Sequence, residues 1–146
     1  MDKRISYKIV LDTETCPIDK DLDGVFPSNM WVYDCGWAIV DKRGRVYRTR
    51  SFVNADIFLE EKELMNSAYY ANKRPIYEEM VADGKCRRIK WSYALRQVAR
   101  ALKDADGIYA FNSRFDTRSI AKTCEMIKAK NPTADGISDI WEGMAN

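Results

Sequence analysis

The chain has 146 residues, of which 46% are hydrophobic, and this suits one globular domain with a packed core. Its 24 basic and 22 acidic residues leave a net charge of only +2, which excludes a protein that coats nucleic acid through bulk positive charge. The absence of histidine excludes Ser-His and Cys-His nucleophilic sites and imidazole metal ligands, so any chemistry must rest on carboxylates.

The cysteines and the N-terminus indicate the compartment. No Cys-x-x-Cys pair is present, which argues against a zinc ribbon, a redox motif or a secreted disulfide framework. The N-terminal residues lack a signal peptide, and no apolar run is long enough to cross a bilayer. We therefore expect a cytoplasmic protein without membrane contact, whose oligomeric state the sequence does not indicate.

The first third of the chain predicts three strands. Residues 7–11 form a short β-rich run, which predicts a buried first strand. Residues 31–40 and 45–53 flank the turn sequence 41–44 and predict a β-hairpin. Alternation along its first strand places five residues on one face: Trp31, Tyr33, Cys35, Trp37 and Ile39.

The remainder predicts helices that alternate with short strands. Residues 59–84 predict two short helices separated at Arg74-Pro75, and residues 88–106 predict one helix that Gly107 ends. Further elements follow as a strand at 108–111, a helix at 114–130 and a last strand at 136–141. This order predicts an α/β fold whose mixed sheet combines a three-stranded antiparallel meander with parallel strands, flanked by helices.

Two acidic residues follow the first apolar run. Asp12 and Glu14 are two positions apart, so in extended chain their carboxylates lie on one face. An isolated Asp-x-Glu is more often a pair of exposed acids at a strand end. Acids directly after a central strand are costly to bury without a partner, however, and Mg²⁺ or Mn²⁺ would remove that cost.

A second group of polar residues surrounds the start of the helix at 114–130. The preceding strand ends at Asn112, and Asp116 falls in the first turn of the helix. Ser113 and Asp116 also match the Ser-x-x-acid pattern of a helix N-terminus. Taken alone, Asp116 is therefore interpreted as a capping residue.

Together, these two groups resemble the DEDD family of 3′-to-5′ exonucleases, the proofreading branch of the ribonuclease H-like superfamily. The sequence from Asp12 to Thr15 is similar to the family's first motif, and the sequence from Asn112 to Asp116 is similar to its second. The resemblance covers nearly the whole chain, because the order of strands and the helical stretch between the motifs also fit. It implies a ribonuclease H-like fold and hydrolysis of phosphodiester bonds at DNA or RNA ends.

The resemblance also implies roles for individual residues. Asp12 and Asp116 would bind the catalytic metals, Glu14 would bind metal and contact the terminal nucleotide, and Thr15 would lie beside that nucleotide. Two Mg²⁺ or Mn²⁺ ions about 3.5–4 Å apart would activate a water and stabilise the leaving oxygen. The expected partner is a single-stranded DNA or RNA 3′ end, with substrate contacts from Asn112, Arg114 and Arg118.

The sequence departs from the family pattern in two places. Phe111 precedes Asn112 where many members have a polar residue. More importantly, the third motif, a Tyr or His followed four residues later by Asp, has no counterpart before Asn146, and Asp139 does not match its position. We therefore expect residues 1–146 to form a single exonuclease-like domain that is C-terminally incomplete or catalytically impaired.

Other interpretations remain open. The chain is alternatively a non-catalytic module that binds nucleic acid or protein on a ribonuclease H-like fold. An α/β domain for an unrelated ligand is a third option, although the glycine-rich nucleotide and phosphate loops are absent. The basic clusters at 87–90 and 114–122 are more often solvated helix faces, and the aromatic residues at 31–37 are more often core than a surface for base stacking. A small exonuclease would suit bacterial or phage DNA metabolism.

Overall fold

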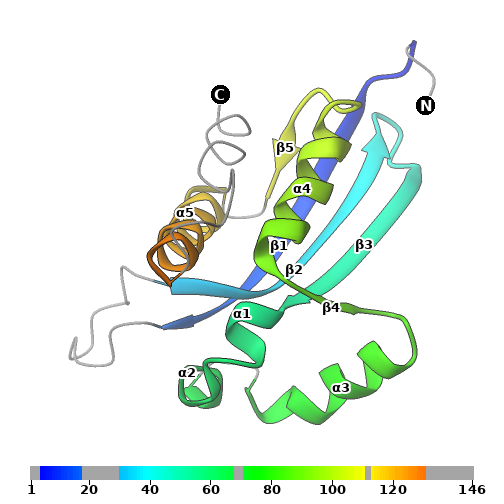
Figure 1. The fold of residues 1–146 in the computed structure, drawn as a ribbon. Coiled ribbons are helices and arrows are strands. Elements are labelled where there is room, and N and C mark those ends of the chain that lie inside the picture. Colours follow the sequence, from blue (N-terminus) through cyan, green and yellow to red (C-terminus); the bar gives the residue numbers. More distant parts are fainter. Residues whose placement is uncertain (1–3, 18–29, 68–70, 111–112, 131–146) are drawn as a thin grey trace.

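The computed structural model describes residues 4–17, 30–67, 71–110 and 113–130, and a five-stranded mixed sheet organises them (Figure 1). Its strand order is β4-β3-β2-β1-β5. The pairs β1–β2 and β2–β3 are antiparallel, whereas β3–β4 and β1–β5 are parallel. The predicted combination of a meander with parallel strands is confirmed. The strands are β1 (Tyr7–Pro17), β2 (Met30–Asp41), β3 (Val46–Asn54), β4 (Arg87–Ile89) and β5 (Ile108–Tyr109).

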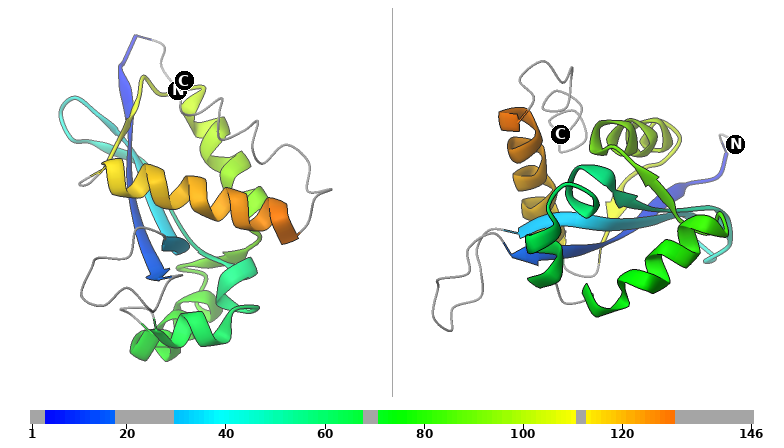
Figure 2. Two further views of the ribbon diagram at one scale, coloured as in Figure 1. Left: turned by 90° about the vertical axis from the view of Figure 1, so that its left-hand side faces the viewer. Right: turned by 60° about the horizontal axis from the view of Figure 1, so that its bottom comes forward.

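Helices lie on both sides of this sheet. Helices α4 and α5 cover one face, and α3 lies towards the opposite side (Figure 2). The meander is connected to α4 by a series of short elements, α1, α2, the 3₁₀ turn η1 and α3, followed by strand β4. The helical segments are α1 (Ala55–Phe58), α2 (Lys62–Ser67), η1 (Ala71–Lys73), α3 (Arg74–Ala82), α4 (Trp91–Leu102) and α5 (Ser113–Lys130).

The core lies between the sheet and the two long helices. Alternate residues of β1 and β2 are buried, among them Ile9, Leu11 and Trp37, as the period of a β-strand requires. From α4, Trp91 and Leu95 face them, as the predicted helical stripe indicated. Burying such side chains is the main force that holds the helices on the sheet.

The first strand is longer than the sequence indicated. It was predicted to end at residue 11, but β1 continues to Pro17 because β2 pairs with it along its whole length. A register shift between Glu14 and Thr15 marks a bulge in this ladder. Asp12 and Glu14 therefore lie within a strand rather than beyond its end.

The helix predicted for residues 88–106 is shorter in the structure. Residues 87–89 pair with β3 as strand β4, so the helix begins only at Trp91. It ends at Leu102, and Gly107 does not terminate it. The chain there already follows β1, because the carbonyl of Gly107 accepts a hydrogen bond from Ile9 N–H at 2.9 Å. Pairing between strands distant in sequence thus overrides the local helical pattern.

The other predicted elements agree more closely with the structure. The β2–β3 hairpin and the helix ending at Lys130 are confirmed. Pro75 lies in the first turn of α3, where a proline is tolerated. Tyr33 and Trp37 are buried, which confirms core packing over a stacking surface. The strand predicted at 136–141 lies outside the described residues.

Two further observations concern the helices and the cysteines. None of the helices in the described ranges is long and apolar enough to span a membrane. No disulfide is formed, and all four cysteines are free thiols in the interior: Cys16, Cys35, Cys86 and Cys124.

A buried threonine of α5 forms a hydrogen bond with the sheet. The Thr123 hydroxyl accepts a hydrogen bond from Val32 N–H of β2 at 2.9 Å and donates one to the Ser119 carbonyl at 2.7 Å. Thr123 is completely buried, so water cannot replace either bond. The contact fixes α5, and with it Asp116, against the strand next to β1.

We expect Thr123→Val to lower the free energy of unfolding by about 1–3 kcal/mol, because it leaves the Val32 N–H buried without an acceptor. Urea denaturation followed by circular dichroism measures this change. The matched control is Thr117→Val, an exposed position on the same helix, which should change stability by less than about 0.5 kcal/mol. Equal stability of the two variants would contradict the anchoring role of Thr123.

Candidate functional site

Three carboxylates lie on one face of the central strands. On β1 the neighbouring residues Leu11 and Thr13 are buried beneath the helices, so alternation places Asp12 and Glu14 on the opposite face. The β-ladder sets Glu14 directly across from Asp34 of β2. The first predicted pair of acids thus gains a third member from the neighbouring strand.

Asp116 reaches the same strand from α5. It lies in the first turn of the helix and is only 6% exposed. Its carboxylate accepts a hydrogen bond from the hydroxyl of Thr13, the residue between Asp12 and Glu14. The structure therefore brings Asp116 to the strand that carries Asp12 and Glu14, about a hundred residues earlier in the chain.

Glu14 is the residue on which these charges act most strongly. Burial raises its pKa to about 7, and the negative charges of Asp12, Asp34 and Asp116 add to the effect. Lys73 from η1 acts in the opposite sense and lowers it. A carboxyl group that is half protonated near neutral pH, among three other acids, is one whose ionised form a cation would stabilise.

Asp34 and Tyr77 are site residues that the sequence analysis missed. The Tyr77 hydroxyl of α3 donates a hydrogen bond to Asp34 at 2.9 Å. Burial raises the pKa of Asp34, and this hydrogen bond partly opposes the rise. The one available signal was an acid between the aromatic and apolar residues Tyr33 and Cys35, but only the strand register shows that it faces Glu14.

Carboxylate oxygens are the donors that this site offers, and hard divalent ions such as Mg²⁺ and Mn²⁺ prefer them. In the described part of the chain, no three acidic or cysteine side chains converge closely enough to hold one ion. The individual carboxylates match such a cation as oxygen donors, but no three of those in the described residues are placed to coordinate one ion together.

The predicted substrate-binding residues differ from one another in their exposure to solvent. Thr15 is half-buried, and its hydroxyl contacts the Met30 sulfur at 3.2 Å. Arg114 and Arg118 are exposed and one helical turn apart on the first half of α5, so they share a face. Asn112 lies outside the described residues.

Parts of the two basic clusters have other partners. Arg88 forms an ion pair with Glu78 at 3.2 Å, and the Arg87 guanidinium lies 5.6 Å from the centre of the Tyr93 ring. On α5, Lys122 pairs with Glu125 at 3.3 Å. These contacts agree with the interpretation of the clusters as solvated helix surfaces. Arg114 and Arg118 are each two residues from Asp116 in the sequence.

Comparison with protein-family models, with curated proteins and with solved structures gives no significant match to this chain.

The raised pKa of Glu14 gives a pH-dependent effect on stability. Because the pKa is about 7 in the folded protein against 4.5 for the free side chain, the folded state loses stability as pH rises from about 4.5 to 7. In EDTA at pH 8, Glu14→Gln should therefore raise stability, by about 1 kcal/mol for a partly exposed group, or about 2–4 °C in Tm. At pH 4 the variant and the parent should unfold alike.

Thermal unfolding at the two pH values tests this expectation. Glu60→Gln, which changes an exposed glutamate, is the matched control and should show no pH-dependent gain. A Glu14→Gln variant that is less stable than the parent at pH 8 would mean that the carboxylates do not repel each other.

Removing the Tyr77 hydroxyl tests the environment of Asp34. In Tyr77→Phe the carboxylate loses a hydrogen bond that stabilises its charged form, so the pKa of Asp34 should rise further. Carbon-detected NMR titration of the labelled Asp34 carboxyl measures it. Tyr93→Phe, at an exposed tyrosine, should leave the titration unchanged, and an unchanged curve in Tyr77→Phe would refute the contact.

Proposed function

We propose that this chain is a metal-dependent 3′-to-5′ exonuclease of the DEDD type, with a ribonuclease H-like fold, that acts on single-stranded DNA or RNA ends. One observation carries the proposal. The negative charge of Asp12 on β1 raises the pKa of both Glu14 on β1 and Asp116 on α5, and Thr13 joins the two motifs by a hydrogen bond.

The fold agrees with this proposal at a coarse level. A five-stranded mixed sheet with a meander, parallel outer strands and flanking helices is compatible with the ribonuclease H-like architecture. It is equally compatible with other α/β proteins, because a fold by itself does not imply a function. Support for the activity therefore comes from the carboxylates.

In the proposed reaction, the chain's own residues hold charge and position the substrate. Asp12, Glu14 and Asp116 offer oxygen ligands, and Mg²⁺ or Mn²⁺ bound there would activate a water and stabilise the leaving oxygen. Glu14, partly protonated without a cation, would become fully ionised when one binds. Arg114 and Arg118 would attract the phosphate backbone towards the start of α5.

The Thr13–Asp116 hydrogen bond has a positioning role in this proposal. Because Thr13 faces the helices while its two neighbours face away, the bond sets where the first turn of α5 lies relative to Asp12 and Glu14. It also stabilises the charged form of Asp116, whose pKa burial raises. The carboxylate is thereby kept available as a ligand.

The decisive experiment is digestion of a 5′-labelled single-stranded oligonucleotide in Mn²⁺. We expect the parent to shorten the strand from its 3′ end and Asp12→Asn to reduce the rate by roughly 100-fold or more, because a metal ligand is lost. Asp104→Asn removes an exposed acid from the turn after α4 and should digest like the parent. Cleavage that is unchanged in Asp12→Asn would refute the assignment.

The same experiment distinguishes the alternative function. A parent protein that binds the oligonucleotide in gel shift yet produces no shortened products with Mn²⁺ or Mg²⁺ would identify a non-catalytic module on this fold. Asp116→Asn then provides a second comparison, since it should abolish cleavage in an enzyme and leave simple strand binding intact.

A further inference from the structure

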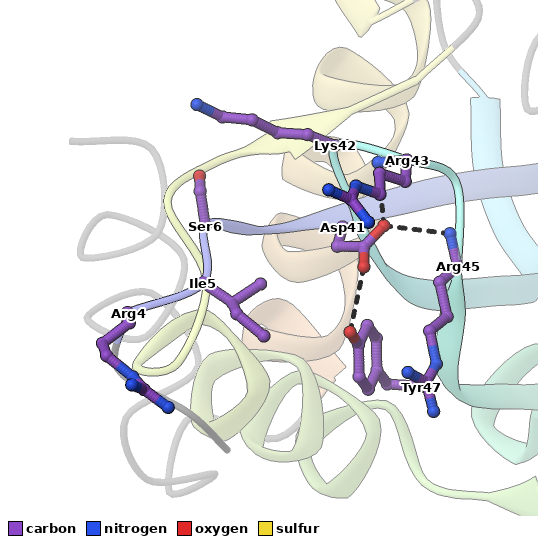
Figure 3. Close-up of a pocket in the computed structure, with 8 residues that line it drawn as sticks. All are labelled: Arg4, Ile5, Ser6, Asp41, Lys42, Arg43, Arg45 and Tyr47. Carbon is purple, nitrogen blue, oxygen red and sulfur yellow. Dashed lines mark hydrogen bonds between the residues drawn. The ribbon is translucent and has the colours of Figure 1, made fainter.

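A basic cavity lies at the end of the sheet away from the carboxylates. It has a volume of about 520 Å³ and separates the residues just before β1 from the β2–β3 turn (Figure 3). Four cationic side chains line it, Arg4, Lys42, Arg43 and Arg45, against one carboxylate, Asp41. Four positive charges and one negative charge make +3 in the lining, more than the +2 of the whole chain.

The carboxylate of Asp41 is engaged by the turn itself. It accepts hydrogen bonds from Arg43 N–H at 2.8 Å, from Arg45 N–H at 3.0 Å and from the Tyr47 hydroxyl at 2.9 Å. These bonds, together with the charge of Arg43, lower its pKa although burial alone would raise it. Asp41 thus organises the backbone of the turn, and the cationic groups of its neighbours project from a fixed frame.

The turn is rigid for a second reason. Asp41 and Arg45 close it with a backbone hydrogen bond of 3.1 Å, and Gly44 adopts a φ of +80°, which side chains other than glycine rarely tolerate. The Arg45 guanidinium lies 5.1 Å from the centre of the Tyr47 ring, which holds it beside the cavity. A ligand therefore meets a turn whose backbone is fixed, with the Arg45 guanidinium held beside the cavity.

These cations are accessible to an anion. Lys42, Arg43 and Arg45 are exposed, and within the described ranges none of them forms an ion pair with a carboxylate. Ser6, which also lines the cavity, donates a hydrogen bond from its hydroxyl to the carboxylate of Asp106.

The positive charge continues from the cavity along β3. Arg48 and Arg50 are exposed on this strand, so five cations occur between positions 42 and 50. One or two of these cations would be enough to bind a single phosphate group. A row of positive groups matches a polymer whose negative charges repeat at regular intervals, as the phosphates of a nucleic-acid strand do.

We propose that the β2–β3 turn and its cavity form a second nucleic-acid contact, which binds the sugar-phosphate backbone at a distance from the carboxylate site. The inference rests on the proposed function only for the identity of the polyanion. Tyr7 pairs with Asp41 and Asp12 with Gly36, so five strand residues, about 17 Å, separate the two regions along β1. The turn would bind a part of the nucleic-acid strand that is distant from the 3′ end at the carboxylates.

The test is fluorescence anisotropy with a labelled 20-nucleotide single-stranded DNA in EDTA, so that binding is measured without cleavage. The variant Lys42→Gln/Arg43→Gln/Arg45→Gln removes three charges from the turn. Its control, Lys62→Gln/Lys85→Gln/Lys103→Gln, removes three charges from exposed lysines elsewhere and gives the same net charge. Circular dichroism of both variants verifies that they fold.

We expect the turn variant to bind at least about tenfold more weakly than the parent at 0.1 M salt, with the slope of log K against log salt reduced by about 2, and the control to stay within about twofold. Equal weakening of both variants, or of neither, would overturn the proposal. So would binding of phosphatidylserine vesicles, but not of DNA, by the parent. Because cleavage is not measured, loss of the proposed exonuclease activity would leave this result unaffected.

Discussion

The pairing of β1 with β2 is the interaction on which the rest of the structure depends. The two strands are hydrogen-bonded from Tyr7 to Pro17, with one bulge, and this ladder places β1 between β2 and β5. The register decides which residues enter the core and which acids meet, since a shift of one residue would exchange the two faces of the strand. Asp12, Glu14 and Asp34 therefore lie on the face opposite the helices, whereas Asp116 reaches β1 from the core side through Thr13.

That arrangement concentrates negative charge around Glu14, which Lys73 offsets only in part. Burial and mutual repulsion raise the pKa of Glu14, and burial also raises the pKa values of Asp34 and Asp116. The hydroxyls of Thr13 and Tyr77 relieve part of this cost through hydrogen bonds. Carboxyl groups with raised pKa values that lie close together support the proposed cation-binding role of these acids.

Charge is distributed unevenly although the chain is almost neutral. The acids gather at the end of β1 that faces α5, and the cations of the β2–β3 turn gather at the opposite end of the same strands. A net charge of +2 is therefore an average over two regions of opposite sign. Such a dipolar surface can attract a polyanion at one end while a cation-binding site is kept at the other.

The sequence by itself determined the class of fold, the hairpin, the helix ending at Lys130 and the two acidic motifs, because hydrophobic periodicity and turn residues are local signals. Only the tertiary structure decided what depends on contacts between distant segments. Strand β4 replaced the predicted start of a helix because β3 was available to pair with it. Asp34 lies beside the predicted acids because the strand register sets it across from Glu14. The cations of the β2–β3 turn line a cavity because the residues before β1 form its other side. The residues next to a position in the sequence do not indicate which distant segment it will contact. The free energy that selects this contact comes from burial and strand pairing across the whole sheet.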